Sequence, residues 1–325
     1  MEMNMETIGI VSFKPEDLTW DKALRLFSLR CRSLNLAAGT QDLYTIRIDG
    51  WRGWLAEHGN PQPLNVKADA IRSYLEDMRA KGWKDATTDS AFRILRTLFR
   101  WLEREGLIIV NPMRNVERPR QEKRLIRPFS EQQLRAFLGA INTKAVVGIR
   151  DFALCVLLAD TGLRVSEALG LGVQDLDFGE SVARVLGKGR RERIVPLGQT
   201  VKRALLDWLK VRGDIAGMDL VFCNRFGQSL KKRTVCDAFH KYGTDAGIDG
   251  VRCSPHTLRH TFAIAYLRNG GDVLTLQKIL GHSTLEMTRR YAEVADSDVI
   301  KRHREASPLD KMGSLPNERK QVRLR

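Results

Sequence analysis

The sequence predicts a mainly α-helical protein with a small antiparallel β-sheet, built from a helical first domain and a mixed α+β second domain. Its length of 325 residues suggests two domains, because a single domain usually holds about 100–200 residues. Apolar residues recur at helical spacing through most of residues 18–106, which predicts an almost wholly helical first part. Over residues 173–197 the apolar residues alternate instead, as they do in half-buried strands.

The first domain is predicted to span residues 18–110, after an N-terminal lead-in at residues 1–17. Within it, Gly, Asn and Pro separate four stretches with helical spacing, and these residue types commonly end or interrupt helices. The four predicted helices cover residues 21–34, 40–58, 66–81 and 86–105. We therefore expect a four-helix unit.

The fourth of these helices has two stripes of different chemistry. One is apolar and follows the i, i+3, i+4, i+7 pattern of a buried face: Ala91, Ile94, Leu95, Leu98 and Leu102. The other is basic: Arg93, Arg96, Arg100 and Arg104. A basic stripe is either a solvated helix face or an edge that contacts DNA phosphates, and in a strongly basic chain the two interpretations weigh equally.

A linker and the second domain follow. Residues 111–128 contain three prolines and many basic residues, which is typical of an extended, solvated linker. The second domain is predicted to span residues 129–308, and residues 309–325 form a basic C-terminal tail. Ser130 is a candidate N-cap for a helix that reaches residue 141.

Within the second domain, the helix at residues 150–159 is almost entirely apolar, so we expect it to be buried on all sides. Two alternating stretches around a turn at residues 187–190 predict a hairpin or small antiparallel sheet. Further helices are predicted at residues 200–212, 232–246, 255–269, 273–280 and 284–294.

Charge and composition exclude several classes of protein. The chain has 54 Lys and Arg against 39 Asp and Glu, which gives a formal net charge of +15 and a pI of about 9.9. A polyanionic partner is therefore expected, nucleic acid before an acidic membrane surface. The longest apolar run, residues 152–159, is far shorter than the ~20 residues of a membrane span. Five scattered cysteines and no apolar signal core predict a cytoplasmic protein with reduced thiols and no zinc site.

Two segments of the second domain place a cation at a turn. Arg164 follows a glycine directly after the buried helix, and Glu167 lies one turn later, close enough to hold the guanidinium group. Lys188 and Arg190 lie in the turn of the predicted hairpin. Each of these residues, taken alone, is more often an ordinary surface residue.

Two further segments place polar side chains at helix ends. Ser254 suits an N-cap, and His256 and Arg259 share one face of the first turn that follows, so this helix start is a candidate anion site. Farther on, Gly281 ends one helix, and Ser283 with Glu286 forms a capping box that starts the next. His282 lies at the joint between them, and Tyr291 lies about two turns into the second helix.

The order of these residues resembles that of the tyrosine recombinase (phage integrase) family. The matching elements are Arg164, Lys188, His256-x-x-Arg259, Leu280-Gly281-His282 and Tyr291, within a resemblance that covers about residues 18–305. Glu167 also matches the acidic residue that the family keeps near its first arginine. The resemblance implies a helical core-binding domain and a catalytic domain that clamp duplex DNA. It further implies a homo-tetramer on two synapsed sites. The short lead-in favours a simple architecture, Xer-like or like that of transposon and integron enzymes, over the lambda integrase type.

The implied chemistry is physically coherent. Arg164 and Arg259 match phosphate oxygens with their guanidinium forks, and His282 can add a third donor. Tyr291 is the implied nucleophile, which becomes joined to the DNA as a 3′-phosphotyrosine. This bond conserves the energy of the cleaved phosphodiester, so strand exchange through a Holliday junction needs no ATP. By the family's assignment His256 is the general base, and Lys188 is the candidate general acid for the leaving 5′-oxygen. No metal or other cofactor is implied.

Two other functions remain open at this point. A type IB topoisomerase uses a similar set of residues but does not exchange strands. A DNA-binding architectural protein could keep the fold without the chemistry, although the intact set of residues argues against it. In every case we expect the basic residues outside this set to contact DNA: Arg93, Arg96, Arg100, Arg104 and Arg190.

Overall fold

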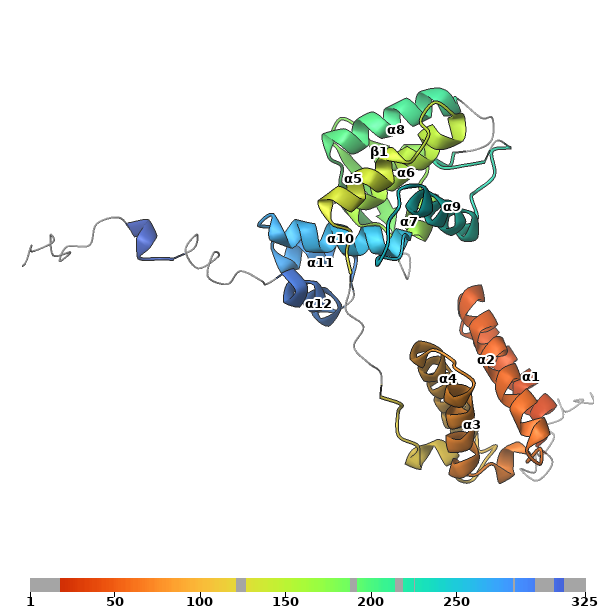
Figure 1. The fold of residues 1–325 in the computed structure, drawn as a ribbon. Coiled ribbons are helices and arrows are strands. Elements are labelled where there is room, and N and C mark those ends of the chain that lie inside the picture. Colours follow the sequence, from red (N-terminus) through yellow and green to blue (C-terminus); the bar gives the residue numbers. More distant parts are fainter. Residues whose placement is uncertain are drawn as a thin grey trace, which may run out of the picture. The chain divides into compact units, whose positions relative to one another are not determined.

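The structure is a computed structural model. It describes residues 18–120, 127–187, 192–213, 219–224, 226–282, 284–295 and 307–312. The chain divides into two compact units, Met1–Arg124 and Leu125–Arg325 (Figure 1). Each unit has its own hydrophobic core. None of the helices in the described part of the chain is long and apolar enough to cross a membrane.

The first unit contains the four predicted helices, and their ends differ from the predicted ones by at most two residues. The elements are α1 (Trp20–Ser33), α2 (Ala38–Glu57), η2 (Pro63–Asn65), α3 (Ala68–Ala80), α4 (Asp85–Arg104) and η3 (Pro112–Asn115). The predicted apolar stripe of α4 is buried and forms the centre of this core. The four arginines of the other stripe are therefore left on the opposite, exposed side of α4.

The second unit is mainly helical with a small sheet, as predicted. Its helices are α5 (Glu131–Gly139), α6 (Val146–Thr161), α7 (Val165–Leu169), η4 (Val173–Asp175), α8 (Gln199–Arg212), α9 (Lys232–Asp245), α10 (Pro255–Arg268), α11 (Val273–Leu280), α12 (Leu285–Ala295) and η5 (Asp310–Met312). Its strands are β1 (Leu176–Asp177), β2 (Val182–Leu186) and β3 (Glu192–Pro196), antiparallel in the order β1-β2-β3. The short helix α7 was not predicted.

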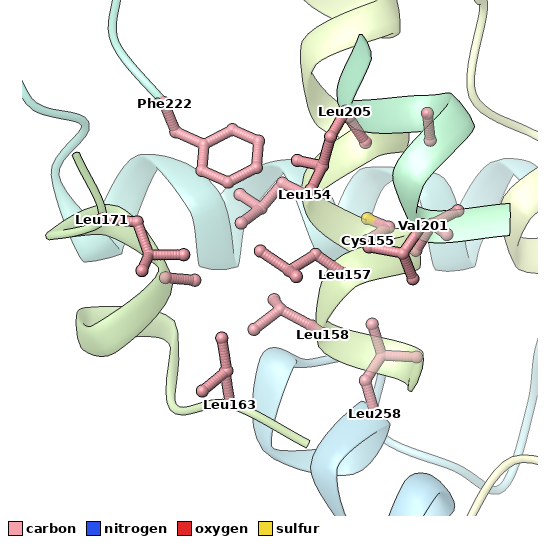
Figure 2. Close-up of a cluster of buried hydrophobic side chains, with 14 of the residues drawn as sticks. Leu154, Cys155, Leu157, Leu158, Leu163, Leu171, Val201, Leu205, Phe222 and Leu258 are labelled. Carbon is pink, nitrogen blue, oxygen red and sulfur yellow. The ribbon is translucent and has the colours of Figure 1, made fainter. Parts of the chain in front are cut away.

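Helix α6 is the centre of the second core (Figure 2). Residues 153–158 of this helix are buried, which confirms the expectation drawn from its apolar sequence. Helices α8 and α10 pack against it. Gly162 ends α6 in a left-handed conformation with φ of 62°, and a Cβ atom there would lie 2.4 Å from the Phe262 ring. This tight turn therefore needs glycine, and it brings the next residues to the edge of the core.

Candidate active site

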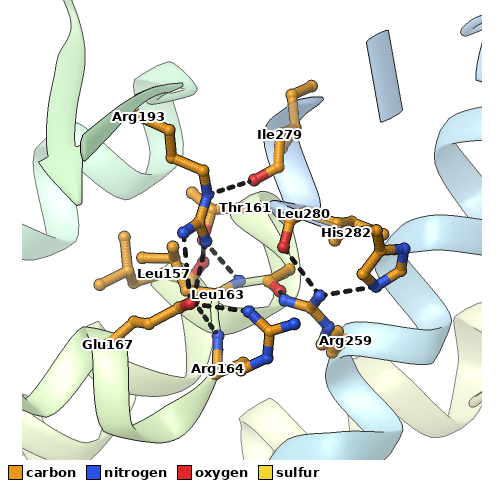
Figure 3. A network of polar contacts seen from close by, with 11 residues as sticks. Leu157, Thr161, Leu163, Arg164, Glu167, Arg193, Arg259, Ile279, Leu280 and His282 are labelled. Atoms are coloured by element: carbon orange, nitrogen blue, oxygen red, sulfur yellow. Dashed lines mark hydrogen bonds and ion pairs between the residues drawn. The ribbon is translucent and has the colours of Figure 1, made fainter. Parts of the chain in front are cut away.

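Glu167 is a buried carboxylate that joins two arginines (Figure 3). Arg164 is the N-cap residue of α7, and both its backbone N–H and its guanidinium group donate to Glu167, at 2.9 and 2.8 Å. Arg193 of β3 donates to both carboxylate oxygens, at 2.7 and 3.2 Å. Burial raises the pKa of Glu167, but the hydrogen bonds and charges of Arg193 and Arg164 outweigh it and bring this pKa below its ordinary value.

Arg193 also reaches a third part of the site. Its Nε atom donates to the carbonyl of Ile279 at 2.8 Å, so the sheet is tied to the last turn of α11. A Cβ atom at Gly281 would lie 3.0 Å from the same guanidinium group. Arg193 was not among the predicted site residues. The alternation of β3 could have identified it, because residues two positions apart lie on the same face of a strand. Val195 is fully buried, so Arg193 points toward the core from the same face.

Arg259 is a buried cation in the first turns of α10. Ser254 caps this helix as predicted, since its hydroxyl accepts the N–H of Thr257. The Arg259 side chain donates to the carbonyls of Gly162 and Leu280, at 2.6 and 2.9 Å, and its residue is only 2% exposed. Burial and the charge of Arg164 lower the pKa of Arg259 to about 10, so the guanidinium group stays protonated at neutral pH.

His282 lies between Arg259 and the helix that contains Tyr291. Its Nε2 is 2.8 Å from Arg259, and its Nδ1 is 2.9 Å from the hydroxyl of Thr288. Because a guanidinium group only donates, Nε2 must accept, and the imidazole proton is therefore on Nδ1. Burial, followed by the charges of nearby arginines, lowers the pKa of His282 to about 4 and keeps the ring neutral. The predicted capping box at Ser283 lies outside the described residues.

Tyr291 is buried beside these groups, with 5% of its surface exposed. Its ring stacks on His282 at a centroid distance of 6.1 Å. Its hydroxyl forms a 2.8 Å hydrogen bond with Nδ1 of His260, a residue with no predicted role. His256 contacts the His260 ring edge-on, with centroids 4.8 Å apart. Burial raises the pKa of Tyr291, and the charges of Arg259 and Arg164 partly oppose this.

The structure thus brings most of the predicted site together. The clustered residues are Arg164, Glu167, His256, Arg259, His282 and Tyr291. Lys188 and Arg190 lie outside the described residues. The α4 arginines belong to the other unit, where three of them line a hollow of about 500 Å³ with residues of α2: Arg93, Arg96 and Arg100. In the described part of the chain no cluster of His, Cys, Asp and Glu suits a metal ion.

Comparison with known proteins agrees with this arrangement. The sequence model described as "Phage integrase family" matches residues 127–298, and that of "Phage integrase, N-terminal SAM-like domain" matches residues 32–106. The tyrosine recombinase XerD of Yersinia pestis is 34% identical over 280 residues, which cover 84% of this chain and 93% of XerD. The tyrosine recombinase XerC of Syntrophus aciditrophicus is 30% identical over 294 residues, which cover 86% of this chain and 94% of XerC.

Solved structures show the same fold. The XerH site-specific recombinase bound to palindromic difH substrate has a TM-score of 0.71 and 22% identity, over 89% of this chain and 85% of XerH. The Tn1549 transposon integrase in complex with circular intermediate DNA has a TM-score of 0.67 and 23% identity, over 84% and 95% of the two chains. Fold and sequence together define a DNA strand-breaking and rejoining enzyme. The chain belongs to the phage integrase family and is a tyrosine-type site-specific recombinase.

Proposed function

We propose that Tyr291 is the nucleophile with which this recombinase cleaves duplex DNA and forms a 3′-phosphotyrosine. The observation that supports this most directly is the position of its hydroxyl in a cluster of fixed cations and neutral imidazoles. A phosphodiester gains negative charge on its non-bridging oxygens during attack, and cations already in place stabilise that charge without reorganisation. The bond energy is kept in the phosphotyrosine, so the strand can be rejoined to a new partner through a Holliday junction.

Arg164 and Arg259 are the proposed phosphate ligands. Arg259 is fixed by two backbone carbonyls, while the Arg164 side chain is 35% exposed and forms the open side of the cluster. His282 has a different part in the arrangement seen here, because its Nε2 accepts from Arg259 and cannot also donate to a phosphate. It therefore positions Arg259, and it becomes a phosphate donor only when Nε2 takes up a proton.

Lys188 and His256 are the proposed proton-transfer groups of the family's mechanism. Lys188 follows β2 by two residues, and as a general acid it would give a proton to the leaving 5′-oxygen. His256 is the base that the resemblance implies. It is exposed at the edge of the cluster, and its pKa is lowered by desolvation from the adjoining protein and by the charges of nearby arginines. It would therefore be neutral, and able to accept a proton, at neutral pH.

Duplex DNA is the proposed partner of the whole chain. The net charge of +15 and the exposed arginines of α4 support this, together with the DNA complexes formed by XerH and the Tn1549 integrase. The sequence predicts the core-binding domain at residues 18–110 and an extended linker at 111–128, but Met113 and Val116 are buried in the core of the first unit. We therefore extend the core-binding domain to residue 116 and place the linker at 117–128, the catalytic domain at 129–308 and the tail at 309–325. We further propose a homo-tetramer on two synapsed sites in the cytoplasm, without a metal or other cofactor.

The test is a search for covalent adducts and recombinant products. The full chain is incubated with fragmented genomic DNA of its source and denatured, and the DNA attached to protein is sequenced. A nicked suicide duplex and a two-site plasmid are then made from the recovered sequence. We expect a covalent adduct on the duplex and joint molecules from the plasmid. Relaxation of supercoils without joint molecules would indicate a topoisomerase, and DNA binding without any adduct would indicate a non-catalytic protein.

A further inference from the structure

Of the two histidines in the first turns of α10, His260 is the one that hydrogen-bonds the reacting atom of Tyr291, a hydroxyl that also receives a hydrogen bond from Arg259. Residues 256, 259 and 260 lie on one face of α10, because side chains three and four positions apart are neighbours on a helix. His260 is the member of this face whose Nδ1 lies 2.8 Å from the Tyr291 hydroxyl oxygen. That distance is within the range for direct proton transfer between a nucleophile and its base. His256 is instead in ring contact with His260.

The electrostatics around Tyr291 set the direction of this hydrogen bond. The cations near the hydroxyl are Arg259 and Arg164, which lower the pKa of Tyr291 and therefore repel its proton. Burial, then the charges of His256 and Arg259, lower the pKa of His260 to about 4, so its ring is neutral and can accept at Nδ1. The phenol proton therefore points away from the arginines and toward the imidazole.

We propose that His260, rather than His256, accepts the proton of Tyr291 when the tyrosine attacks DNA. This inference rests on the proposed role of Tyr291 as nucleophile. The Oη–H proton moves to Nδ1 of His260 while the Oη–P bond forms. The P–O5′ bond then breaks, and the 5′-oxygen takes a proton from Lys188. On rejoining, the 5′-hydroxyl returns its proton to Lys188 and attacks phosphorus, while Oη leaves and recovers its proton from His260.

Bound DNA strengthens His260 in this role. A scissile phosphate held by Arg164 and Arg259 adds a negative charge close to the imidazole, and a nearby negative charge favours the protonated form. The pKa of His260 therefore rises when DNA binds, toward the range in which a base works best at neutral pH. His256 has a separate task as a positioning residue, because its ring packs against the ring that receives the proton.

The experiment makes the nucleophile more acidic, so that it needs less help from a base to lose its proton. Tyr291 is replaced in the full chain by a fluorinated tyrosine, whose phenol loses its proton at lower pH than tyrosine does. This exchange is made in the natural sequence, in His260→Gln and in the matched control His256→Gln. The first-order rate of adduct formation on the suicide duplex is measured from acid to alkaline pH, with DNA affinity and thermal unfolding measured beside it.

With ordinary Tyr291, we expect His260→Gln to slow adduct formation by about 10²–10⁴-fold while DNA affinity is kept, the range typical of a lost general base. With the fluorinated tyrosine, most of this loss should disappear once the pH exceeds the pKa of the phenol. His256→Gln should not be rescued in this way, because its defect is one of position. In the natural sequence the rate of adduct formation should fall at acid pH, where His260 becomes protonated and can no longer accept the proton. With the fluorinated tyrosine this fall should be absent at every pH above the pKa of its phenol, because the phenol is then already ionised.

Three results would overturn the inference. Cleavage by His260→Gln at the natural rate or faster would mean that His260 only holds Tyr291 in a resting position. Rescue of His256→Gln but not of His260→Gln would assign the proton to His256. A further variant, His260→Asn, is used if His260→Gln does not fold. If neither folds, a fall in rate at acid pH that the fluorinated tyrosine leaves unchanged would also overturn the inference. An absence of adduct with the natural sequence would instead contradict the proposed function.

Discussion

The two units use arginine in opposite ways. On α4 the side chains of Arg93 and Arg104 are 60% and 65% exposed, and their acidic partners, Asp89 and Glu105, lie on the same helix or next to it. In the second unit the Arg193 side chain is 12% exposed, and Arg259 is 2% exposed. The guanidinium groups of the first set stay largely in water, although Arg93 pairs with the buried carboxylate of Asp89. Those of the second set are themselves buried and are fixed by Glu167 and by backbone carbonyls.

This contrast separates affinity from catalysis. An exposed arginine keeps its conformational freedom, its charge is screened by salt, and its contribution to DNA binding is nearly additive. A buried arginine has already given up that freedom on folding. Its donors are therefore in place before DNA arrives, which is what stabilisation of a transition state requires. We therefore expect the same substitution, made in the two units, to affect different steps.

The largest effect is expected for Arg259→Lys. Lysine has all its donors on one nitrogen, so it cannot reproduce the two-nitrogen fork that reaches the carbonyls of Gly162 and Leu280 and the ring of His282. The charge is therefore retained while its geometry is lost. Adduct formation at saturating DNA should fall by about 10²–10³-fold, the range seen when one preorganised donor is removed. Single-turnover cleavage measures this, with thermal unfolding as the control for folding. A loss of less than tenfold would mean that the buried geometry is not needed.

An intermediate effect is expected for Arg193→Gln. This change leaves Glu167 with Arg164 as its remaining side-chain partner and releases the last turn of α11 from the sheet. The rate of cleavage should fall by about 10–100-fold, as for other residues that orient a catalytic group without contacting the substrate. Because Arg193 acts through Glu167, the losses in Arg193→Gln and Glu167→Gln should not add in the double variant. Additive losses would show that the two residues act separately.

The smallest effect is expected for Arg100→Ala on α4. If Arg100 contacts one phosphate, the negative slope of log K against log[salt] should become less steep by about 0.9 in the variant. Its rate of cleavage at saturating DNA should not change. Arg135→Ala is the matched control, since this arginine is 78% exposed on α5 and pairs with Glu131. Binding titrations at several salt concentrations compare the two. Equal losses would mean that α4 has no special part in binding.

The local parts of the structure could be predicted from the sequence. Helical spacing located the main helices, the Ser254 cap is present, and the i, i+3 spacing of Arg164 and Glu167 gave their ion pair. Each of these depends on residues a few positions apart. Helix α7 was missed because its five residues are too few to show a helical period.

The long-range parts of the site could not be predicted in this way. Arg259 donates to the Gly162 carbonyl across 97 positions, and His260 meets Tyr291 across 31. Both contacts depend on how α10 packs against α6 and α12, which residue spacing does not encode. The choice between two histidines four positions apart therefore needed the structure.

The most direct test of the account is to find which residue becomes attached to DNA. The denatured adduct is digested with trypsin and nuclease, and the peptides that retain a nucleotide are sequenced by mass spectrometry. Trypsin releases Tyr291 at the start of the peptide 291–301, apart from the four other tyrosines: Tyr44, Tyr74, Tyr242 and Tyr266. We predict that a nucleotide joined through its 3′-phosphate is found on Tyr291 alone. A nucleotide on another residue, or one joined through its 5′-phosphate, would contradict the proposed chemistry.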